Sequence, residues 1–159
     1  YYLYRFNFYN RVDNGDLSAD GNRSKLDLSG CTGIAEAKLF AANNYGHAFY
    51  YATDKGAYSF SPSSGGSTSS TLYECEQSET VTALYTWDSS GFPTAGSIVW
   101  IAVWNESTRE GKLIEFEIDP NAGTPLWMYG GSFAPEHSNP HITTGWGKIV
   151  SITCTSTEG

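Results

Sequence analysis

The chain has 159 residues, a net charge of −8 and only 9 Lys and Arg residues. This length corresponds to one domain with a sizeable core, and the balance of 40% apolar to 16% charged residues is typical of a folded chain. Because so few cations are present to neutralise phosphates, a nucleic-acid partner is excluded and adsorption to an anionic membrane surface is disfavoured.

The first elements in chain order are predicted to be strands. In residues 1–10, Tyr and Phe alternate with Leu3, Arg5 and Asn7, which is the period-2 pattern of a half-buried strand. A loop over 11–23, a short strand over 24–28 and a connection over 29–35 follow. A start that is so regular and apolar is typical of the interior of a longer protein. We therefore expect a processed or partial chain.

A four-strand pattern then occurs twice, over 36–76 and 80–130. Four short strands in a repeat of about 40–50 residues predict a propeller blade. The expected strands are 38–44, 47–54, 56–62 and 71–76 in the first copy, and 80–87, 97–104, 111–120 and 124–129 in the second.

The end of the chain is predicted to contain one more strand. The segment 131–146 has several Gly and Pro residues and no clean periodicity, whereas 147–156 alternates as a strand does. No window has helical spacing. The predicted fold is a single all-β unit over 1–159, built from antiparallel four-stranded, blade-like sheets of a partial β-propeller, with a β-sandwich as the alternative. Two blades leave unpaired edges, which predicts a missing partner.

Four stretches of this pattern resemble a known family, the PKD-like surface lipoproteins of Bacteroidetes. The likeness is to their C-terminal propeller portion and covers roughly 36–156. It rests on HAFYYATDKGAYSFS, TLYECEQSETVTALYTW, KLIEFEIDP and the closing GWGKIVSIT.

The resemblance implies a cell-surface lipoprotein that assists a SusC/SusD-type outer-membrane uptake system, with no catalytic residues. The family is several hundred residues long, so the chain would correspond to its C-terminal third. The lipid-bearing cysteine of such a lipoprotein is absent, because Cys31 follows no apolar run.

A calcium site is the first candidate for chemistry. Oxygen-bearing residues at positions 1, 3, 5 and 12 of a loop, with Gly21 at position 6, match a calcium-binding loop. Arg23 at position 8 and the absence of flanking helices favour an ordinary turn-rich loop instead. The candidate ligands are Asp16, Ser18, Asp20, Asn22 and Asp27.

Two further groups of polar residues have simpler interpretations than a catalytic or metal site. Glu136, His137 and His141 are close in sequence, but Pro135 and Pro140 exclude the helix that would align them on a transition metal. Carboxylates alternate along two predicted strands, which permits a glycosidase acid pair but is more typical of a solvated face. They are Glu115, Glu117 and Asp119, and Glu74 and Glu76.

Aromatic residues near strand ends and loops are candidates for ligand binding, since exposed rings stack on sugars or anchor protein interfaces. Most of the 24 aromatic residues must nevertheless fill the core. The candidates are Trp146, Phe92, Trp127 and Tyr129, together with Trp87.

The three cysteines, Cys31, Cys75 and Cys154, have no CxxC spacing, which disfavours zinc and implies no disulfide framework. For Cys75 and Cys154, both in predicted strands, we expect buried, unpaired thiols.

From these features we expect a non-enzymatic component of an extracytoplasmic, outer-membrane uptake complex that handles glycan or peptide. Its partners would be other protein subunits, and no cofactor is expected unless the calcium site forms. The alternatives are a stand-alone carbohydrate-binding domain and a glycoside hydrolase that uses paired carboxylates.

Overall fold

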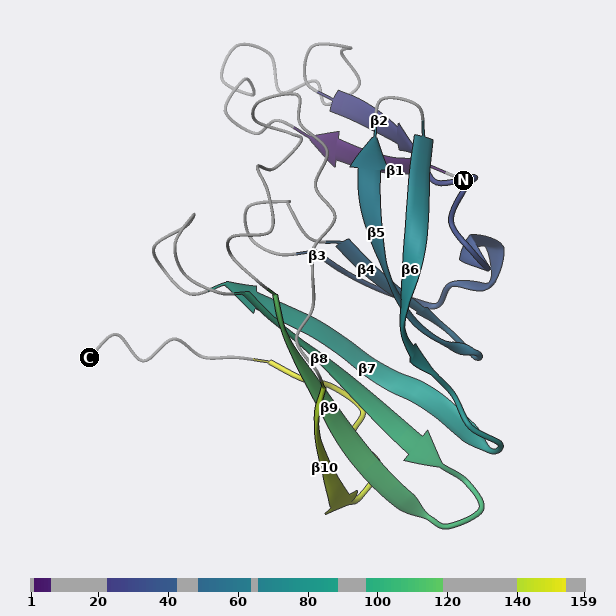
Figure 1. Cartoon of the computed structure of the whole chain (residues 1–159), viewed down its shortest axis with the longest axis vertical. Helices are drawn as coiled ribbons and strands as arrows, with labels where there is room; N and C mark the ends of the chain where they lie inside the picture. The colour runs from purple at the N-terminus through teal and green to yellow at the C-terminus, as the bar shows by residue number, and fades with distance from the viewer. Residues whose placement is uncertain are drawn as a thin grey trace, which may run out of the picture.

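The computed structural model describes residues 2–6, 23–42, 49–63, 66–88, 97–118 and 140–153. Within these ranges the chain is almost entirely β-structure, as the alternating patterns predicted (Figure 1). No helix in this part is long and apolar enough to span a bilayer. The elements are β1 (Tyr2–Phe6), β2 (Arg23–Asp27), the 3₁₀ turn η3 (Ile34–Glu36), β3 (Leu39–Ala42), β4 (Phe49–Thr53), β5 (Gly56–Ser63), β6 (Gly66–Glu74), β7 (Glu79–Asp88), β8 (Ser97–Asn105), β9 (Glu110–Ile118) and β10 (His141–Trp146).

Two four-stranded antiparallel sheets form the body of the molecule, and each follows the chain order of its strands. The first sheet has the order β3-β4-β5-β6 and the second has the order β10-β9-β8-β7, while β1 and β2 pair separately. In Figure 1 the first sheet lies between the β1–β2 pair and the second sheet. Two successive meanders of this kind occur both in neighbouring propeller blades and in a two-layer sandwich. In this chain neither sheet closes on itself.

The two sheets pack face to face through one apolar core. From the first sheet Tyr50, Ala52 and Ala57 point into it, and alternate residues of β8 and β9 enter from the second sheet. These central strands are apolar on both faces, so the first sheet contributes to a second core on its opposite side. The residues of the shared core are Tyr50, Ala52, Ala57, Val99, Ile101, Val103, Ile114 and Phe116.

The second core lies between the first sheet and the segment 28–37. Tyr51 pairs with Tyr58 across the strands, and their rings stack with centroids 5.0 Å apart. Phe49 and Phe60 form the next stacked pair at 5.1 Å. Such pairs add about 0.5–1.5 kcal/mol each beyond their buried area. Leu28, Cys31 and Ile34 cover them, so the connection predicted over 29–35 closes one face of the first sheet.

Two predictions near the C-terminus are wrong. The segment 131–146 was expected to contain no strand, yet His141–Trp146 pairs with β9 as the fourth strand of the second sheet. Its β-branched Ile142, Thr143 and Thr144 favour a strand, but Pro140 and Gly145 leave it too short for a clear alternation. The fourth strand expected at 124–129 lies outside the described residues.

The strand expected over 147–156 is absent over 147–153. Gly145 has a φ of +82° within a register shift between Thr143 and Trp146, and the pairing of β10 with β9 ends at Trp146. The segment 147–153, called the tail below, then contacts other strands of the sheet. The Thr82 hydroxyl of β7 donates a hydrogen bond to the Ile149 carbonyl at 2.6 Å, and the alternation of the tail therefore reflects packing rather than pairing in a ladder.

Candidate functional site

A row of four side chains crosses the outer face of the second sheet, the face turned away from the first sheet. Tyr85 of β7 is paired with Trp100 of β8, Trp100 with Glu115 of β9, and Glu115 with His141 of β10. Their neighbours Val99, Ile101 and Ile114 enter the shared core, so alternation directs the row outward. Tyr85, Trp100 and Glu115 are half-buried and His141 is exposed.

The geometry of this outer row combines stacking surface with hydrogen-bonding groups. The rings of Tyr85 and Trp100 are 5.9 Å apart and inclined by 21°. Trp100 Nε1 donates a hydrogen bond to Glu115 Oε2 at 2.6 Å, which fixes the indole and the carboxylate relative to each other. Aromatic rings beside carboxylate and imidazole groups can stack on a sugar ring and bind its hydroxyls.

Trp146 and the tail lie toward one end of the same face. Trp146 is 50% exposed, and its Nε1 donates to the Thr143 hydroxyl at 3.1 Å. Beside it Trp104 is only 6% exposed, and Arg109 and Lys148 lie over its ring at 5.6 and 5.8 Å. The tail residue Lys148 therefore helps to cover Trp104, whereas Trp146 stays accessible.

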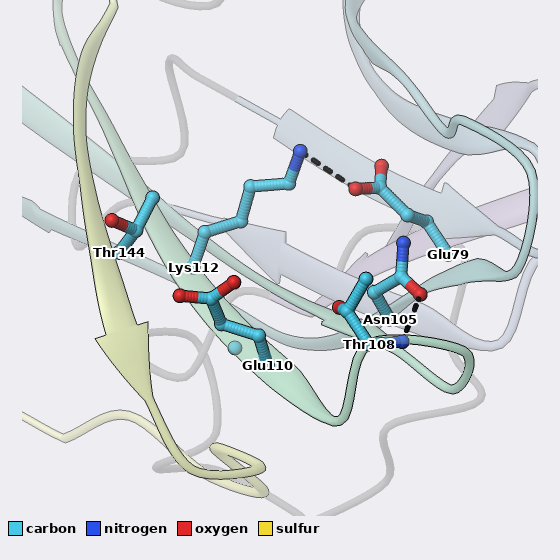
Figure 2. Close-up of a pocket in the computed structure, with 7 residues that line it drawn as sticks. Glu79, Asn105, Thr108, Glu110, Lys112 and Thr144 are labelled. Carbon is cyan, nitrogen blue, oxygen red and sulfur yellow. Dashed lines mark hydrogen bonds and ion pairs between the residues drawn. The ribbon is translucent and has the colours of Figure 1, made fainter.

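A polar pocket of about 190 Å³ opens at the β8–β9 end of the second sheet (Figure 2). Figure 2 shows the Lys112 side chain extending toward Glu79, with Glu110 and Thr144 on one side and Asn105 and Thr108 on the other. Gly111 completes the lining. Asn105 Oδ1 accepts N–H bonds from Ser107 and Thr108 at 2.9 and 3.1 Å, which holds the turn that joins β8 to β9.

A buried ion pair borders this pocket. Lys112 Nζ lies 2.6 Å from Glu79 Oε1, and the two side chains are 21% and 3% exposed. Glu79 Oε2 also accepts hydrogen bonds from the Tyr73 hydroxyl and the Glu76 N–H. Burial alone would raise the pKa of Glu79, but the hydrogen bonds from Lys112, Tyr73 and Glu76 outweigh it and lower the pKa.

The partners of Glu79 are shifted by the same contacts. Burial and the hydrogen bond to Glu79 raise the pKa of Tyr73 to about 12. Burial opposes the charged form of Lys112, yet its contacts with Glu79 and Tyr73 raise its pKa well above the usual range. At neutral pH the cluster therefore holds one carboxylate, one ammonium and a neutral phenol, and its net charge is zero.

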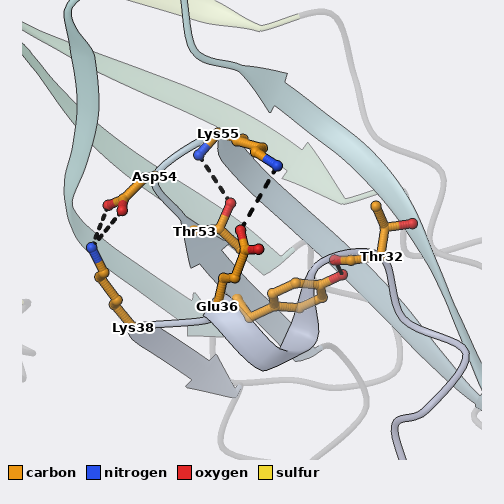
Figure 3. Close-up of polar contacts among 7 residues, drawn as sticks. Thr32, Glu36, Lys38, Thr53, Asp54 and Lys55 are labelled. Atoms are coloured by element: carbon orange, nitrogen blue, oxygen red, sulfur yellow. Dashed lines mark hydrogen bonds and ion pairs between the residues drawn. The ribbon is translucent and has the colours of Figure 1, made fainter.

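A second group of polar contacts lies where the segment 28–37 meets the first sheet (Figure 3). Lys38 pairs with Asp54 at 2.6 Å and Lys55 with Glu36 at 3.8 Å, but all four side chains are more than half exposed. Such surface pairs contribute little to stability. The Tyr51 hydroxyl donates to the Thr32 carbonyl at 2.6 Å and holds this segment over the second core, so the group is explained by folding.

Only some residues predicted from the sequence can be placed. Trp146 and Trp87 belong to the second sheet, and Asp27 ends β2, where its Oδ1 accepts the Ser29 N–H at 2.9 Å. In the described part of the chain no three His, Cys, Asp or Glu residues gather as metal ligands. Glu115 and Glu117 both belong to β9. The residues that fall outside the described ranges are Phe92, Trp127, Tyr129, Asp16, Ser18, Asp20, Asn22, Asp119, Glu136, His137 and Cys154.

The two described cysteines are free. Cys31 is buried in the second core and Cys75 is half-buried directly after β6. Burial raises the pKa of both thiols to about 11, and nearby Asp27 and Glu79 add to the effect for Cys31 and Cys75 respectively. The expectation of an unpaired thiol is therefore confirmed for Cys75.

The outer row was missed because its members were assigned to unrelated roles. Trp100 was read as part of an apolar strand, Glu115 as one of an acid pair, and His141 as a metal candidate. The signal was present in the alternation of each strand, but cross-strand register is needed to join four strands in one line. Glu79 and Lys112 are 33 residues apart and carry no local motif.

The comparisons with known proteins add no relative. No family, no curated protein and no solved structure matches this chain.

Proposed function

We propose that this chain is a non-enzymatic binding component of a SusC/SusD-type outer-membrane uptake complex at the bacterial cell surface, and that its ligand is a glycan. The observation that supports the glycan is the outer row, in which two stacked aromatic rings lie beside a carboxylate and an imidazole. The uptake complex and its protein subunits come from the sequence resemblance, and the glycan is the class of nutrient that such a row suits.

The outer row suits a neutral sugar better than a charged ligand. An aromatic ring can stack on the apolar face of a sugar without a buried charge. Glu115 keeps one oxygen, Oε1, that accepts no hydrogen bond from another described residue, and His141 is exposed beside it. A carboxylate oxygen and an imidazole can bind adjacent hydroxyls of one sugar, because a hydroxyl both donates and accepts.

The test is a polysaccharide-binding assay with wild-type chain and the variant Trp100→Ala, measured by affinity electrophoresis and calorimetry. Phe40→Ala is the matched control, since Phe40 is an exposed aromatic of the first sheet with 54% exposure. A ring that stacks on a nucleic-acid base contributes about 1–3 kcal/mol, and on that scale we expect Trp100→Ala to weaken glycan binding about fivefold to 150-fold. We expect Phe40→Ala to leave binding unchanged.

Two other results would contradict the proposal, and each points to one alternative. If no glycan binds but Trp100→Ala abolishes association with a membrane partner, the outer row is a protein interface. An interface at this face is what a propeller with a further blade packed on the second sheet would require. If the chain hydrolyses a glycan and Glu115→Gln removes that activity, it is a glycoside hydrolase.

A further inference from the structure

We propose that the polar pocket between β7, the β8–β9 turn and β10 is a second binding site, which takes a single neutral sugar residue. Its lining combines an ammonium, two carboxylates, an amide and two hydroxyls around a volume of about 190 Å³. None of these residues belongs to the outer row. The inference deepens the proposed function, on which the choice of a sugar among polyhydroxylated molecules rests.

The pocket is built around a fixed, buried charge pair. The Glu79 side chain is 3% exposed, and Lys112, Tyr73 and the Glu76 N–H engage both of its oxygens. Glu79 thus positions Lys112 and is not itself available to a ligand. The Lys112 ammonium has three donors, of which Glu79 and Tyr73 engage two at most, so one remains for the pocket.

The other lining groups also offer unused hydrogen-bonding capacity. Because Asn105 Oδ1 accepts two backbone N–H bonds, the amide is oriented and its NH₂ is left as a donor. Within the described ranges, no hydrogen bond or ion pair joins the Glu110 carboxylate to another residue, and the same holds for the hydroxyls of Thr108 and Thr144. Figure 2 shows these groups on opposite sides of the same opening.

This mixture of groups favours a hydroxyl-bearing ligand over an anion. Because Glu79 already balances the charge of Lys112, the uncompensated charge of the lining is that of Glu110, which repels an anion, and the remaining side chains of the lining offer neutral hydrogen-bonding groups. A sugar hydroxyl can accept from Lys112 or Asn105 and donate to Glu110 at once. The volume equals that of about six water molecules, so the pocket has room for a single small ring.

The experiment measures binding of free glucose, galactose and mannose by saturation-transfer NMR, in wild-type chain and in three variants. Thr144→Val removes one hydroxyl at constant size and Glu110→Gln removes a charged acceptor. Thr71→Val, in the first sheet, is the control for the same chemical change. We expect Thr144→Val to weaken affinity about threefold to tenfold, Glu110→Gln about tenfold or more, and Thr71→Val not at all.

The variant Trp100→Ala separates this inference from the proposed function. If the sugars bind equally to Trp100→Ala and wild type, and the pocket variants weaken them, the pocket is the site. If Trp100→Ala alone removes binding, the sugars lie on the outer row, so the pocket inference fails and the proposed function stands. Absence of any transfer, or binding that survives both pocket variants, also overturns the pocket inference.

Discussion

Replacing Glu79 with Gln tests whether the Glu79–Lys112 pair holds the second sheet together at its β8–β9 end. The change leaves the Lys112 ammonium beside a neutral amide in a site where Glu79 was 3% exposed. Breaking a buried pair costs about 3–5 kcal/mol. Because Lys112 is 21% exposed and can turn toward water, we expect the lower end of that range, about 3 kcal/mol.

The assay is urea unfolding followed by tryptophan fluorescence, with linear extrapolation to water. For a chain of this length a loss of about 3 kcal/mol corresponds to a fall in Tm of roughly 6–12 °C. Glu110→Gln is the matched control, because it makes the same chemical change at an exposed residue only two positions from Lys112, and it should stay within about 0.5 kcal/mol of wild type.

A double-mutant cycle and a pH series test the cause. Lys112→Met alone leaves Glu79 without its cation, so the double variant should cost less than the sum of the single ones, with a coupling of at least about 1 kcal/mol. The lowered pKa of Glu79 means that its contribution is present above its unfolded pKa of about 4.3 and is lost as pH falls through the folded pKa. The gap between wild type and Glu79→Gln should therefore narrow below about pH 4.

A cost of Glu79→Gln below about 1 kcal/mol, additive effects of the single variants, or a gap that stays constant at acid pH would show that the ion pair does not stabilise the sheet.

Three further predictions concern close packing and the thiols. A Cβ at position 111 would lie 2.3 Å from the Gly147 carbonyl oxygen, so Gly111→Ala should destabilise the chain by about 1–3 kcal/mol. A Cβ at position 147 would meet nothing within 4 Å, so Gly147→Ala should leave the stability unchanged. Equal melting temperatures of the two variants would contradict this expectation. Thr82→Val removes the bond to Ile149 and should speed hydrogen exchange in the tail with little change in Tm; an unchanged exchange rate would count against that contact. In a chain that carries Cys154→Ser, Cys31 and Cys75 should react with Ellman's reagent at pH 8 far more slowly in the native state than in urea. The reason is that with a pKa of about 11 only about a thousandth of each thiol is ionised. A fast phase in the native chain would show that one of the two thiols is accessible.

The sequence was sufficient to predict those strands whose alternation is long and uninterrupted. Strands β7, β8 and β9 have nine or ten residues each and were placed within one or two positions of the predicted ranges. β10 has six residues, His141–Trp146, which follow Pro140 and include Gly145, and this is too few for a periodicity to stand out. The tail shows the converse, since its alternation is regular but 147–153 pairs with no strand among the described residues.

The candidate sites were beyond sequence reasoning for a different reason. Lys112 reads as an ordinary polar residue at the start of a strand, and Glu79 as a surface acid before one. Only the packing of β7 beside the β8–β9 turn buries the two together, and that arrangement depends on contacts between residues more than 30 positions apart. A pattern with period 2 states which face a side chain occupies, but not which neighbour covers that face.

The two sheets show how one pattern can serve both core and surface. In the first sheet Phe40, Tyr51 and Tyr58 are paired across β3, β4 and β5, and in the second sheet Tyr85, Trp100 and Glu115 are paired across the corresponding β7, β8 and β9. Tyr51 and Tyr58 are 0% and 7% exposed because the segment 28–37 lies over them.

In the outer row of the second sheet, Glu115 occupies the position that the aromatic residue Tyr58 has in the first sheet. In the described part of the chain, the tail contacts the second sheet near Trp104 and Thr82. A buried carboxylate without a cation is costly, so Glu115 is compatible with a face that meets water or a hydroxyl-rich ligand and is poorly compatible with a dry apolar interface. That difference at one position is why the glycan, rather than a further sheet, is the partner that we assign to the outer row.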